Sequence, residues 1–294
     1  MSRIAVVTGG STPERDVAFA GASQVVDALR SAGHFVSVVD TVLGALAGQS
    51  EDQVLKPTVG RLPPTNEELG ALAERENLSD IVQLPELQLA DVIFLLLHGR
   101  QGEGGELQGL LDDAGLPYTG SDATASALAM DKDAAKRKFL EVGITTHPWC
   151  MWPADSETIE QIGFPLIVKP SKVGSSVGLS VVSSEDGLRE AVDTATNYDN
   201  DVMLEQFLPG RELTVGVLGD RALAVGEILP SHELFDYECK YTPGMTEEVF
   251  PAQIDEALRD GLQTQALAAH RALGLRDFSR VDFKEDASGV PQCL

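Results

Sequence analysis

Hydrophobic and polar positions along the first third of the chain predict strands and helices in alternation. Short apolar runs predict strands at 4–8 and 35–39, with a helical stretch between them that ends near Arg30. The continuous apolar run at 92–97 predicts a buried strand. Such alternation is typical of a parallel sheet covered by helices. We interpret the Pro-rich and polar segment 41–80 as a variable surface excursion.

The pattern changes after residues 115–120, which we take as a domain boundary. The elements expected next are a helix at 126–142, strands at 165–169, 179–182 and 202–208, and a helix at 184–196 opened by Ser184 as its cap. These short, mixed elements predict a small α+β unit.

Antiparallel pairing is expected in the last part of the chain. Strands at 213–218 and 222–228 flank Gly219-Asp220, a turn sequence typical of a hairpin. The last elements expected are an irregular segment at 231–251, an amphipathic helix at 254–273, and strands at 279–284 and 290–294. We therefore predict three domains, at 1–120, 121–208 and 209–294.

The charge balance changes the picture of possible partners. The chain of 294 residues has 46 Asp and Glu against 22 Lys and Arg, a net charge of -24. Without a concentrated basic run, this balance argues against nucleic acid and anionic membranes as partners.

The apolar runs and the cysteines of the sequence are consistent with a cytoplasmic protein. The apolar start at 4–7 is too short for a signal peptide, and the run at 92–97 is far below the roughly 20 residues of a spanning helix. Cys150, Cys239 and Cys293 have no metal or redox spacing. We expect a reducing, cytoplasmic environment.

The stretch from Lys169 to Gly178, KPSKVGSSVG, is the most informative about chemistry. A lysine at a strand end and a Gly/Ser loop that returns to a strand offer a cation and backbone N–H groups to phosphate oxygens. The spacing differs from that of a Walker A loop. The alternative is an ordinary hairpin loop with a surface lysine.

Two further strands carry suggestive charges. The first holds Glu205 and leads to Glu212, and such an edge suits adenine and ribose; the alternative is a core strand with solvated acids. On the other, a period of two places Arg280 and Asp282 on one face. Asp is a ligand that Mg²⁺ prefers, although such a pair is often a simple surface ion pair.

Three loops complete the set of candidate sites. Residues 9–16 form an acid-bearing turn after the first strand, and residues 98–105 form a loop after the strand at 92–97. Open α/β sheets bind ligands at such strand ends. The loop at 235–245 holds an unexplained Lys-Tyr pair, Lys240 and Tyr241.

Taken in order, these stretches resemble the D-alanine:D-alanine ligases of the ATP-grasp superfamily. The motifs GGxxxER, LHGxxGExGxLQG, KPSxxGSSVG, DYExKY and RxDF recur in family order from residue 3 onward. The resemblance implies an α/β and α+β fold: an N-terminal open parallel-sheet domain, then two ATP-grasp subdomains that hold ATP between them.

The resemblance also implies an activity and its cofactors. Two D-alanines would be joined through an acyl phosphate made from ATP, with Mg²⁺ or Mn²⁺, for peptidoglycan precursor synthesis. Phosphoryl transfer depends mainly on placement and charge neutralisation. The residues that match nucleotide positions are Lys132, Lys169 and Lys240 at the phosphates, and Glu205, Gln206, Leu208 and Glu212 at adenine and ribose.

The remaining family positions concern the amino acid and the metal. Glu14 matches the residue that holds the ammonium of the first D-alanine, and His98 lies at the same subsite, although it could instead be a strand-end histidine hydrogen-bonded in the core. Ser175 and Tyr241 match partners of Glu14. Arg280 matches an arginine at the tetrahedral centre, and Asp282 matches one metal ligand. The family also implies a homodimer.

The resemblance departs from the family pattern after Val290. Family members continue into a strand with Glu-x-Asn that supplies further metal ligands, and then into a segment that holds the second D-alanine. We therefore expect the sequence as written to be inactive or nearly so. Two other hypotheses are a short protein that binds nucleotide or amino acid without ligation, and a ligase whose second substrate is a D-hydroxy acid.

Overall fold

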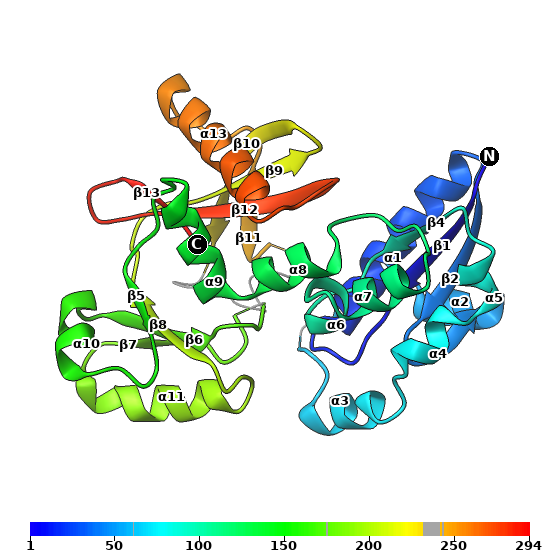
Figure 1. Cartoon of the computed structure of the whole chain (residues 1–294), viewed down its shortest axis with the longest axis horizontal. Coiled ribbons are helices and arrows are strands. Elements are labelled where there is room, and N and C mark those ends of the chain that lie inside the picture. Colours follow the sequence, from blue (N-terminus) through cyan, green and yellow to red (C-terminus); the bar gives the residue numbers. More distant parts are fainter. Residues whose placement is uncertain (61, 175, 232–241, 243) are drawn as a thin grey trace. The chain divides into compact units, whose positions relative to one another are not determined.

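The chain folds into two compact units, Met1–Ala127 and Leu128–Leu294. A computed structural model describes all residues except 61, 175, 232–241 and 243 (Figure 1). The sequence predicted a boundary near residue 120, and the two units divide after residue 127. The predicted boundary at 208 stays a prediction.

The first unit is built on a four-stranded sheet of order β3-β2-β1-β4. Its strands are β1 (Arg3–Thr8), β2 (Phe35–Asp40), β3 (Gly44–Leu46) and β4 (Val92–Leu95). β1 pairs in parallel with both β2 and β4, and the edge strand β3 is antiparallel to β2. The predicted parallel sheet covered by helices is confirmed.

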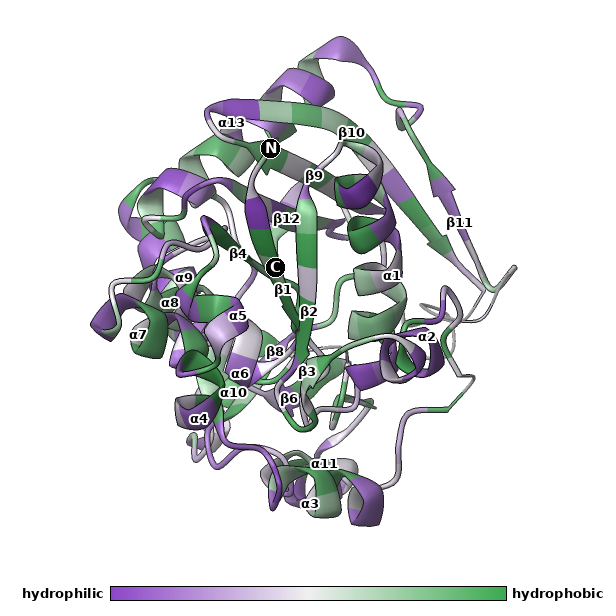
Figure 2. Cartoon of the chain, turned by 90° about the vertical axis from the view of Figure 1, so that its right-hand side faces the viewer, coloured by the Kyte–Doolittle hydropathy of each residue, from purple (hydrophilic) through white to green (hydrophobic). Residues whose placement is uncertain are grey.

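Alternate residues of β1 supply two separate cores. Ile4 and Val6 pack with helix α1 (Arg15–Ser31), while Ala5 and Val7 belong to the core on the opposite face. That face is covered by α4 (Leu78–Val82), α5 (Pro85–Gln88) and α7 (Glu106–Asp113). The strands of this sheet are mostly hydrophobic because both faces are covered (Figure 2).

The segment 41–80 has more structure than its composition indicates. Besides β3 and α4 it forms α2 (Gln49–Val54) and α3 (Asn66–Ala73). Thr65 and Glu68 form a capping box at the start of α3, with Glu68 N donating to Thr65 Oγ1 and Thr65 N donating to Glu68 Oε2. The sequence indicates a variable surface excursion here; most of the residues from 49 to 76 are exposed or half-buried, and they form these short helices.

The second unit contains two sheets. One has the order β5-β8-β6-β7 and all its pairs are antiparallel. Its strands are β5 (Trp149–Met151), β6 (Leu166–Pro170), β7 (Ser180–Val182) and β8 (Val202–Gln206). Helices α10 (Ser156–Ile162) and α11 (Leu188–Thr196) pack on one of its faces. The predicted strands in this region are confirmed.

The other sheet has five strands in the order β11-β10-β9-β12-β13. They are β9 (Glu212–Leu218), β10 (Arg221–Pro230), β11 (Thr246–Val249), β12 (Phe278–Glu285) and β13 (Pro291–Cys293). Helix α13 (Glu256–Ala272) covers the apolar face of this sheet. Hydrophobic and hydrophilic residues alternate along the helix (Figure 2). β11 pairs with the end of β10, so part of the segment predicted to be irregular is a strand.

Two helix predictions need correction. The helix expected at 126–142 is two helices, α8 (Ala123–Met130) and α9 (Lys132–Glu141), because the side chain of Asp131 between them accepts from Ala134 N and starts a new helix. Ser184 makes no side-chain cap. A short 3₁₀ turn (Glu185–Gly187) precedes α11 instead, as is common at helix starts.

The remaining short helix, α6 (Arg100–Glu103), follows β4 in the first unit. In the described part of the chain, no helix is long and apolar enough to cross a membrane.

Candidate functional site

The face of the β5-β8-β6-β7 sheet opposite α10 and α11 carries the strongest group of predicted residues. Leu204 points into the core beneath α10 and α11, so its neighbour Glu205 points to the opposite face. Glu205 lies opposite Ile167 on β6, and Lys169 is two residues further along that strand. The two side chains are diagonal neighbours, and the ammonium of Lys169 forms an ion pair with Oε1 of Glu205.

A second lysine and a histidine hold the other oxygen of Glu205. Lys136 Nζ lies 3.2 Å and His147 Nε2 3.0 Å from Oε2. The side chains of Lys136 and His147 are each 1% exposed and that of Glu205 6%. Both nitrogens lie within hydrogen-bonding distance of Oε2, so charge and hydrogen bonding together hold this oxygen.

Burial and charge shift the protonation of this group in opposite directions. Burial disfavours the ionised form of Glu205, but Lys169, Lys136 and His147 outweigh it and hold the pKa of the carboxyl well below its usual range. Burial lowers the pKa of Lys136 to about 8, although the charge of Glu205 opposes this shift. Burial also lowers the pKa of His147. Glu205 therefore stays ionised at neutral pH.

Helix α9 brings a third lysine to the same place. Lys132 lies one turn before Lys136, a spacing that puts both on one face of the helix. Its Nζ donates to the carbonyl oxygens of Ser171, at 3.2 Å, and Val173, at 2.8 Å, in the loop after β6. Burial, reinforced by the charge of Lys169, lowers its pKa to about 8. Three lysines thus surround one carboxylate, and this excess positive charge suits an anion.

The polar face of the five-stranded sheet gathers another set of predicted residues. Asp282 on β12 lies opposite Thr214 on β9, whose hydroxyl donates to Asp282 Oδ1 at 2.7 Å. Arg280 donates to both oxygens of the same carboxylate, at 2.9 and 2.7 Å. Glu212 lies 3.3 Å from Lys284 Nζ on the neighbouring strand. The predicted common face of Arg280 and Asp282 is what the structure shows.

The two groups of the second unit meet at Cys293 on β13. Cys293 N donates to Thr145 O, and Thr146 Oγ1 donates to Cys293 O, which ties the segment before His147 to β13. Burial raises the pKa of the Cys293 thiol to about 12, and both Lys136 and Asp282 act on it electrostatically. The thiol stays protonated and serves in the core.

The other predicted nucleotide residues lie at the end of β8. Gln206 faces away from Glu205, and its N–H donates to Pro148 O at 3.0 Å. Leu208 is buried. Their predicted contacts with adenine stay predictions. Ser175, Lys240 and Tyr241 lie outside the described residues.

In the first unit, the predicted amino-acid residues lie at the carboxyl ends of the strands. Glu14 directly precedes α1. The next residue, Arg15, is buried and its Nη2 lies 2.5 Å from Asp40 Oδ2 at the end of β2, while its Nη1 donates to Gly10 O. The Arg of the ER motif therefore anchors the turn that carries Glu14.

His98 is positioned by its own loop. Its Nδ1 lies 3.7 Å from Glu103 Oε1, and its carbonyl oxygen accepts from Thr12 Oγ1 at 3.4 Å. Glu103 Oε2 also accepts from Gly99 N at 2.7 Å. The side chain of His98 is 33% exposed, which does not fit a core histidine. Its predicted role at the amino-acid subsite stays a prediction.

Sequence reasoning missed Lys136 and His147. Lys136 stands in the basic run Lys136-Arg137-Lys138, which resembles a solvated helix face; Arg137 is indeed exposed and Lys138 is half-buried. The spacing of four from Lys132 is the signal that could have singled it out. His147 carried no signal, because its partner Glu205 is distant in sequence.

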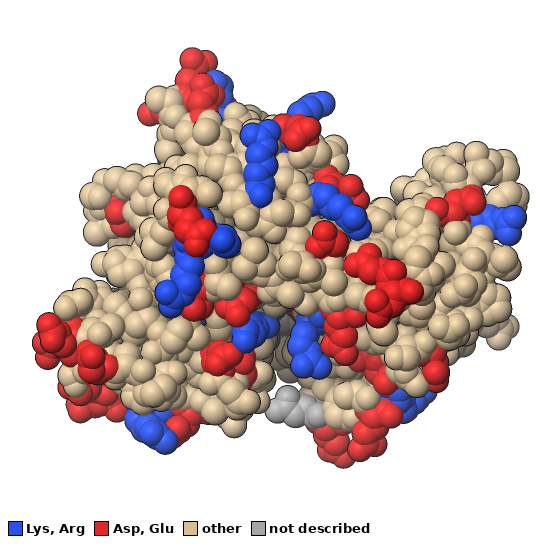
Figure 3. Space-filling model, in the orientation of Figure 1, with Lys and Arg blue, Asp and Glu red and all other residues tan. Residues whose placement is uncertain are grey.

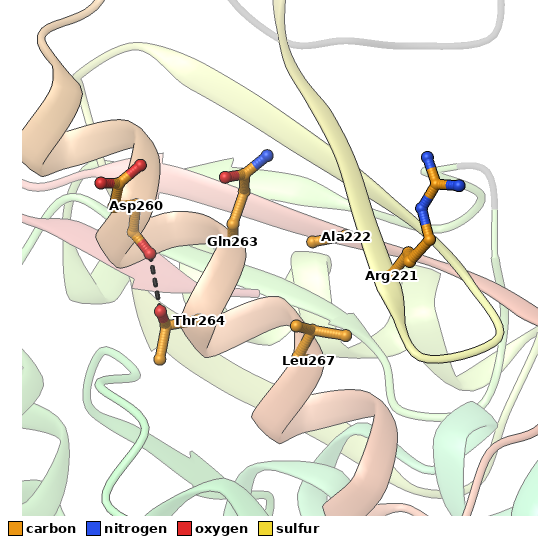
Figure 4. Close-up of a pocket in the computed structure, with 6 residues that line it drawn as sticks. All are labelled: Arg221, Ala222, Asp260, Gln263, Thr264 and Leu267. Carbon is orange, nitrogen blue, oxygen red and sulfur yellow. Dashed lines mark hydrogen bonds between the residues drawn. The ribbon is translucent and has the colours of Figure 1, made fainter.

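Some features of the described surface do not belong to this site. A shallow pocket of about 410 Å³ lies between α13 and the β9–β10 hairpin, and no predicted site residue lines it (Figure 4). Gln263, which lines it, donates to Leu223 O. Among the described residues, no group of three or more His, Cys, Asp or Glu side chains is placed to hold a metal.

A sheet face with clustered lysines, in one unit with a second sheet that has charged residues on its polar face, fits an ATP-grasp protein. Comparisons with known proteins agree. The family model "D-ala D-ala ligase N-terminus" matches residues 3–121, and "D-ala D-ala ligase C-terminus" matches residues 139–292.

Individual relatives cover most of the chain. A D-alanine–D-alanine ligase of Geobacter sulfurreducens is 39% identical over 286 residues, which is 96% of this chain and 79% of the relative. The crystal structure of the VanG D-Ala:D-Ser ligase from Enterococcus faecalis is 29% identical with a TM-score of 0.77, covering 99% of this chain and 88% of that one. The chain belongs to the D-alanine–D-alanine ligase family.

The fold is also that of a D-alanine–D-alanine ligase from Bacillus anthracis complexed with ATP. That likeness has a TM-score of 0.77 at 23% identity, and it covers 100% of this chain and 85% of the other. The predicted ATP-grasp fold with an N-terminal parallel-sheet domain is confirmed.

Proposed function

We propose that this protein joins two D-alanine molecules to D-alanyl-D-alanine and uses ATP to do so. The observation that carries the nucleotide half is the group of Lys132, Lys136 and Lys169 near the buried carboxylate Glu205. A local excess of buried positive charge in a chain of net charge -24 fits a polyphosphate. Membership in the ligase family supports the amino-acid half.

Amide formation needs an activated carboxylate. The carboxylate oxygen of the first D-alanine attacks the γ-phosphorus of ATP, and ADP leaves with the electron pair of the broken bond. The amine of the second D-alanine, after losing a proton, attacks the acyl carbon of this acyl phosphate, and phosphate leaves. Such transfers need placement and charge neutralisation more than covalent help from the protein.

The residues take roles that follow from their chemistry. Lys132 and Lys169, with Lys240, neutralise the phosphates. Glu205, which the family resemblance matches to the adenine and ribose positions, keeps the lysines in place as their counter-ion, because its carboxylate pairs with Lys136 and Lys169. Glu212, Gln206 and Leu208 serve the ribose and base. Glu14 and His98 hold the first D-alanine, with Ser175 and Tyr241 as partners of Glu14. Arg280 stabilises the negative charge that develops on the carbonyl oxygen during attack.

Magnesium is proposed only as the companion of ATP. Asp282 is the one predicted ligand among the described residues, and both its oxygens already accept hydrogen bonds from Arg280 and Thr214. A Mg²⁺ ion has near-octahedral coordination by oxygen, which these residues alone do not supply. Charge neutralisation by this chain's own side chains therefore rests on the lysines and Arg280.

The setting follows from the family. We propose that the product enters peptidoglycan precursor synthesis in the cytoplasm and that the protein forms a homodimer. Acidic side chains are spread over the face drawn in Figure 3, with no large patch of Lys and Arg, which supports small molecules rather than nucleic acid as partners.

The experiment for the nucleotide half compares two lysines of the second unit. We expect Lys169→Met to weaken ATP binding by about tenfold to a hundredfold, the worth of a hydrogen bond to a charged group, as measured by calorimetry. Lys138→Met is the control, since the side chain of Lys138 is 43% exposed and pairs with Glu141 at 2.7 Å. Equal affinities in the two variants would contradict the proposal.

The choice of second substrate is tested by product analysis. One structural relative is named for D-Ser, so D-serine and D-lactate are offered to the enzyme beside D-alanine, and ATP-dependent phosphate release and the products are measured. We expect D-alanyl-D-alanine to predominate. ATP binding with no phosphate release on addition of any of the three would favour a protein that binds without ligation.

A further inference from the structure

The carboxylate of Glu76 joins three loops of the first unit. It lies between α3 and α4, in the segment that the sequence marks as a surface excursion. Its Oε2 accepts from Ser11 Oγ at 2.6 Å and from Gln101 Nε2 at 2.9 Å, and its Oε1 accepts from Thr41 Oγ1 at 2.5 Å. Gln101 Nε2 also donates to Ser11 Oγ, which closes a triangle of hydrogen bonds.

Each donor follows a different strand of the sheet. Ser11 follows β1, Thr41 follows β2, and Gln101 lies in α6 after β4. Because these strands are parallel, the three loops emerge at one edge, the carboxyl edge where open α/β sheets bind ligands. A single side chain therefore hydrogen-bonds to all three loops at this edge.

The fastened loops are those that carry the predicted amino-acid residues. Ser11 stands three residues before Glu14, and Gln101 stands three residues after His98. The two loops also touch directly, since Thr12 Oγ1 donates to His98 O. Gly99 has a φ of +77°, and a Cβ there would come within 2.9 Å of Thr12 Cγ2, so the approach leaves no room for a side chain.

Simple local roles do not account for Glu76. The N-cap of α4 is Asn77, whose side chain accepts from Asp80 N, so the helix needs no carboxylate from Glu76. Hydrogen bonds to an ionised acceptor are stronger than those between neutral groups. Three such bonds converge on this half-buried carboxylate, and their donors lie 25 to 65 residues from Glu76 in the sequence.

We propose that Glu76 is a positioning residue for the amino-acid subsite. It does not touch the substrate. Its three hydrogen bonds fix the loops of Glu14 and His98 in the arrangement that binds the ammonium of a small amino acid. This inference rests on the proposed function and adds a residue outside the recurring family motifs.

The experiment measures D-alanine and ATP binding separately in the full chain. In Glu76→Ala we expect the dissociation constant for D-alanine, measured by calorimetry with a saturating non-hydrolysable ATP analogue so that no turnover occurs, to rise about tenfold, as for a hydrogen-bond network worth ~1.4 kcal/mol. The dissociation constant for ATP should not change, because the lysine group lies in the other unit. Glu74→Gln, an exposed acid two residues away, is the matched control and should match the wild type.

Two further variants guard against a general loss of fold. Glu76→Gln keeps the size of the side chain and should raise the D-alanine constant with thermal unfolding close to wild type. Ser11→Ala combined with Glu76→Ala should weaken D-alanine binding no more than Glu76→Ala alone, because both remove one network.

The outcomes separate the two proposals. D-alanine affinity unchanged in both Glu76 variants, or weakened together with ATP affinity, would overturn the positioning role and leave the proposed function standing. A wild-type chain that binds neither ATP nor D-alanine would overturn the proposed function, and with it this inference.

Discussion

Glu205 shows how a single residue can organise a buried charged site. Removing an ionised carboxylate from water is costly unless opposite charges surround it. Here two lysines and a histidine supply that compensation, and the pKa of the carboxyl falls well below its usual range. In turn, the lysines are held at fixed positions before any ligand arrives. Such preorganisation reduces the cost of binding an anion.

Lys132 makes ATP affinity depend on pH in a predictable direction. Burial lowers its pKa to about 8, so its ammonium is present below that pH and is lost as the pH rises through it. Because phosphates bind the charged form, ATP affinity should be nearly constant up to about pH 7, begin to fall near pH 8, and be about tenfold or more lower by pH 9.5. Calorimetry across this range measures the fall.

Arginine replacements test which lysine is responsible. Lys132→Arg keeps its charge at all these pH values, so the fall should be smaller in this variant. Lys138→Arg, on the same helix but with its side chain 43% exposed and paired with Glu141, should leave the fall as in the wild type. A pH profile that is the same in Lys132→Arg and the wild type would rule out the titration of Lys132.

At the residue scale, the sequence predicted the residues that stand in local motifs and missed their distant partners. Lys169 and Glu205 were both predicted, but their ion pair was not, because it depends on the register between β6 and β8. His147 and Glu76 gave no signal for the same reason. Both act on groups that only the fold brings near.

Among the elements, α9 connects packing with function. Ala135 and Phe139 bury one side of the helix against the five-stranded sheet and α13. The side chains of Lys132 and Lys136 lie on another side of the helix and contact the β5-β8-β6-β7 sheet and its loop. The place where this helix begins therefore decides where its first lysine lies, and Asp131 sets that beginning.

Removal of this cap should affect both stability and nucleotide binding. Asp131→Ala removes the hydrogen bond from Ala134 N at 3.1 Å and should lower the free energy of unfolding by about 1 kcal/mol. The first turn should fray, and with it Lys132, so ATP affinity should also fall. Denaturant unfolding and calorimetry measure the two effects.

The N-cap of α10 offers a matched control. Asp155 accepts from Thr158 N at 2.8 Å, so Asp155→Ala should cost a similar free energy of unfolding. Since α10 covers the opposite face of the sheet, ATP affinity should stay as in the wild type. A loss of ATP affinity in both variants would show that general destabilisation, not the start of α9, is the cause.

Elements with clear periodicity were predicted well, and boundaries set by single side chains were not. The β9–β10 hairpin and α13 were predicted from alternation and from helical spacing. The break at Asp131 was missed because the apolar pattern continues across it. β11 was missed because an edge strand of four residues needs a partner, β10, to be recognised.

At the scale of the whole molecule, the net charge of -24 acts on stability more than on nucleotide binding. Like charges on a compact surface repel one another, and this repulsion destabilises the folded state. The lysine group is buried, and it acts on a phosphate at short range. Exposed acids beyond a Debye length of about 8 Å in physiological salt therefore oppose phosphate binding little. The two effects can therefore be separated by salt.

Salt should raise the melting temperature until screening is complete. Raising NaCl from about 0.01 to 0.5 M shortens the Debye length from about 30 Å to a few Å, which should remove most of the repulsion between surface acids. A gain of about 1 kcal/mol corresponds to a rise of about 2–4 °C for a unit of 150–250 residues. The rise should level off near 0.5 M, and KCl should act as NaCl does, because only ionic strength matters for screening.

A rise that continues linearly to high salt, and is larger with sulfate, would instead indicate exclusion of salt from the surface. A melting temperature that does not change would mean that the acids already lie far enough apart to be neutral to stability.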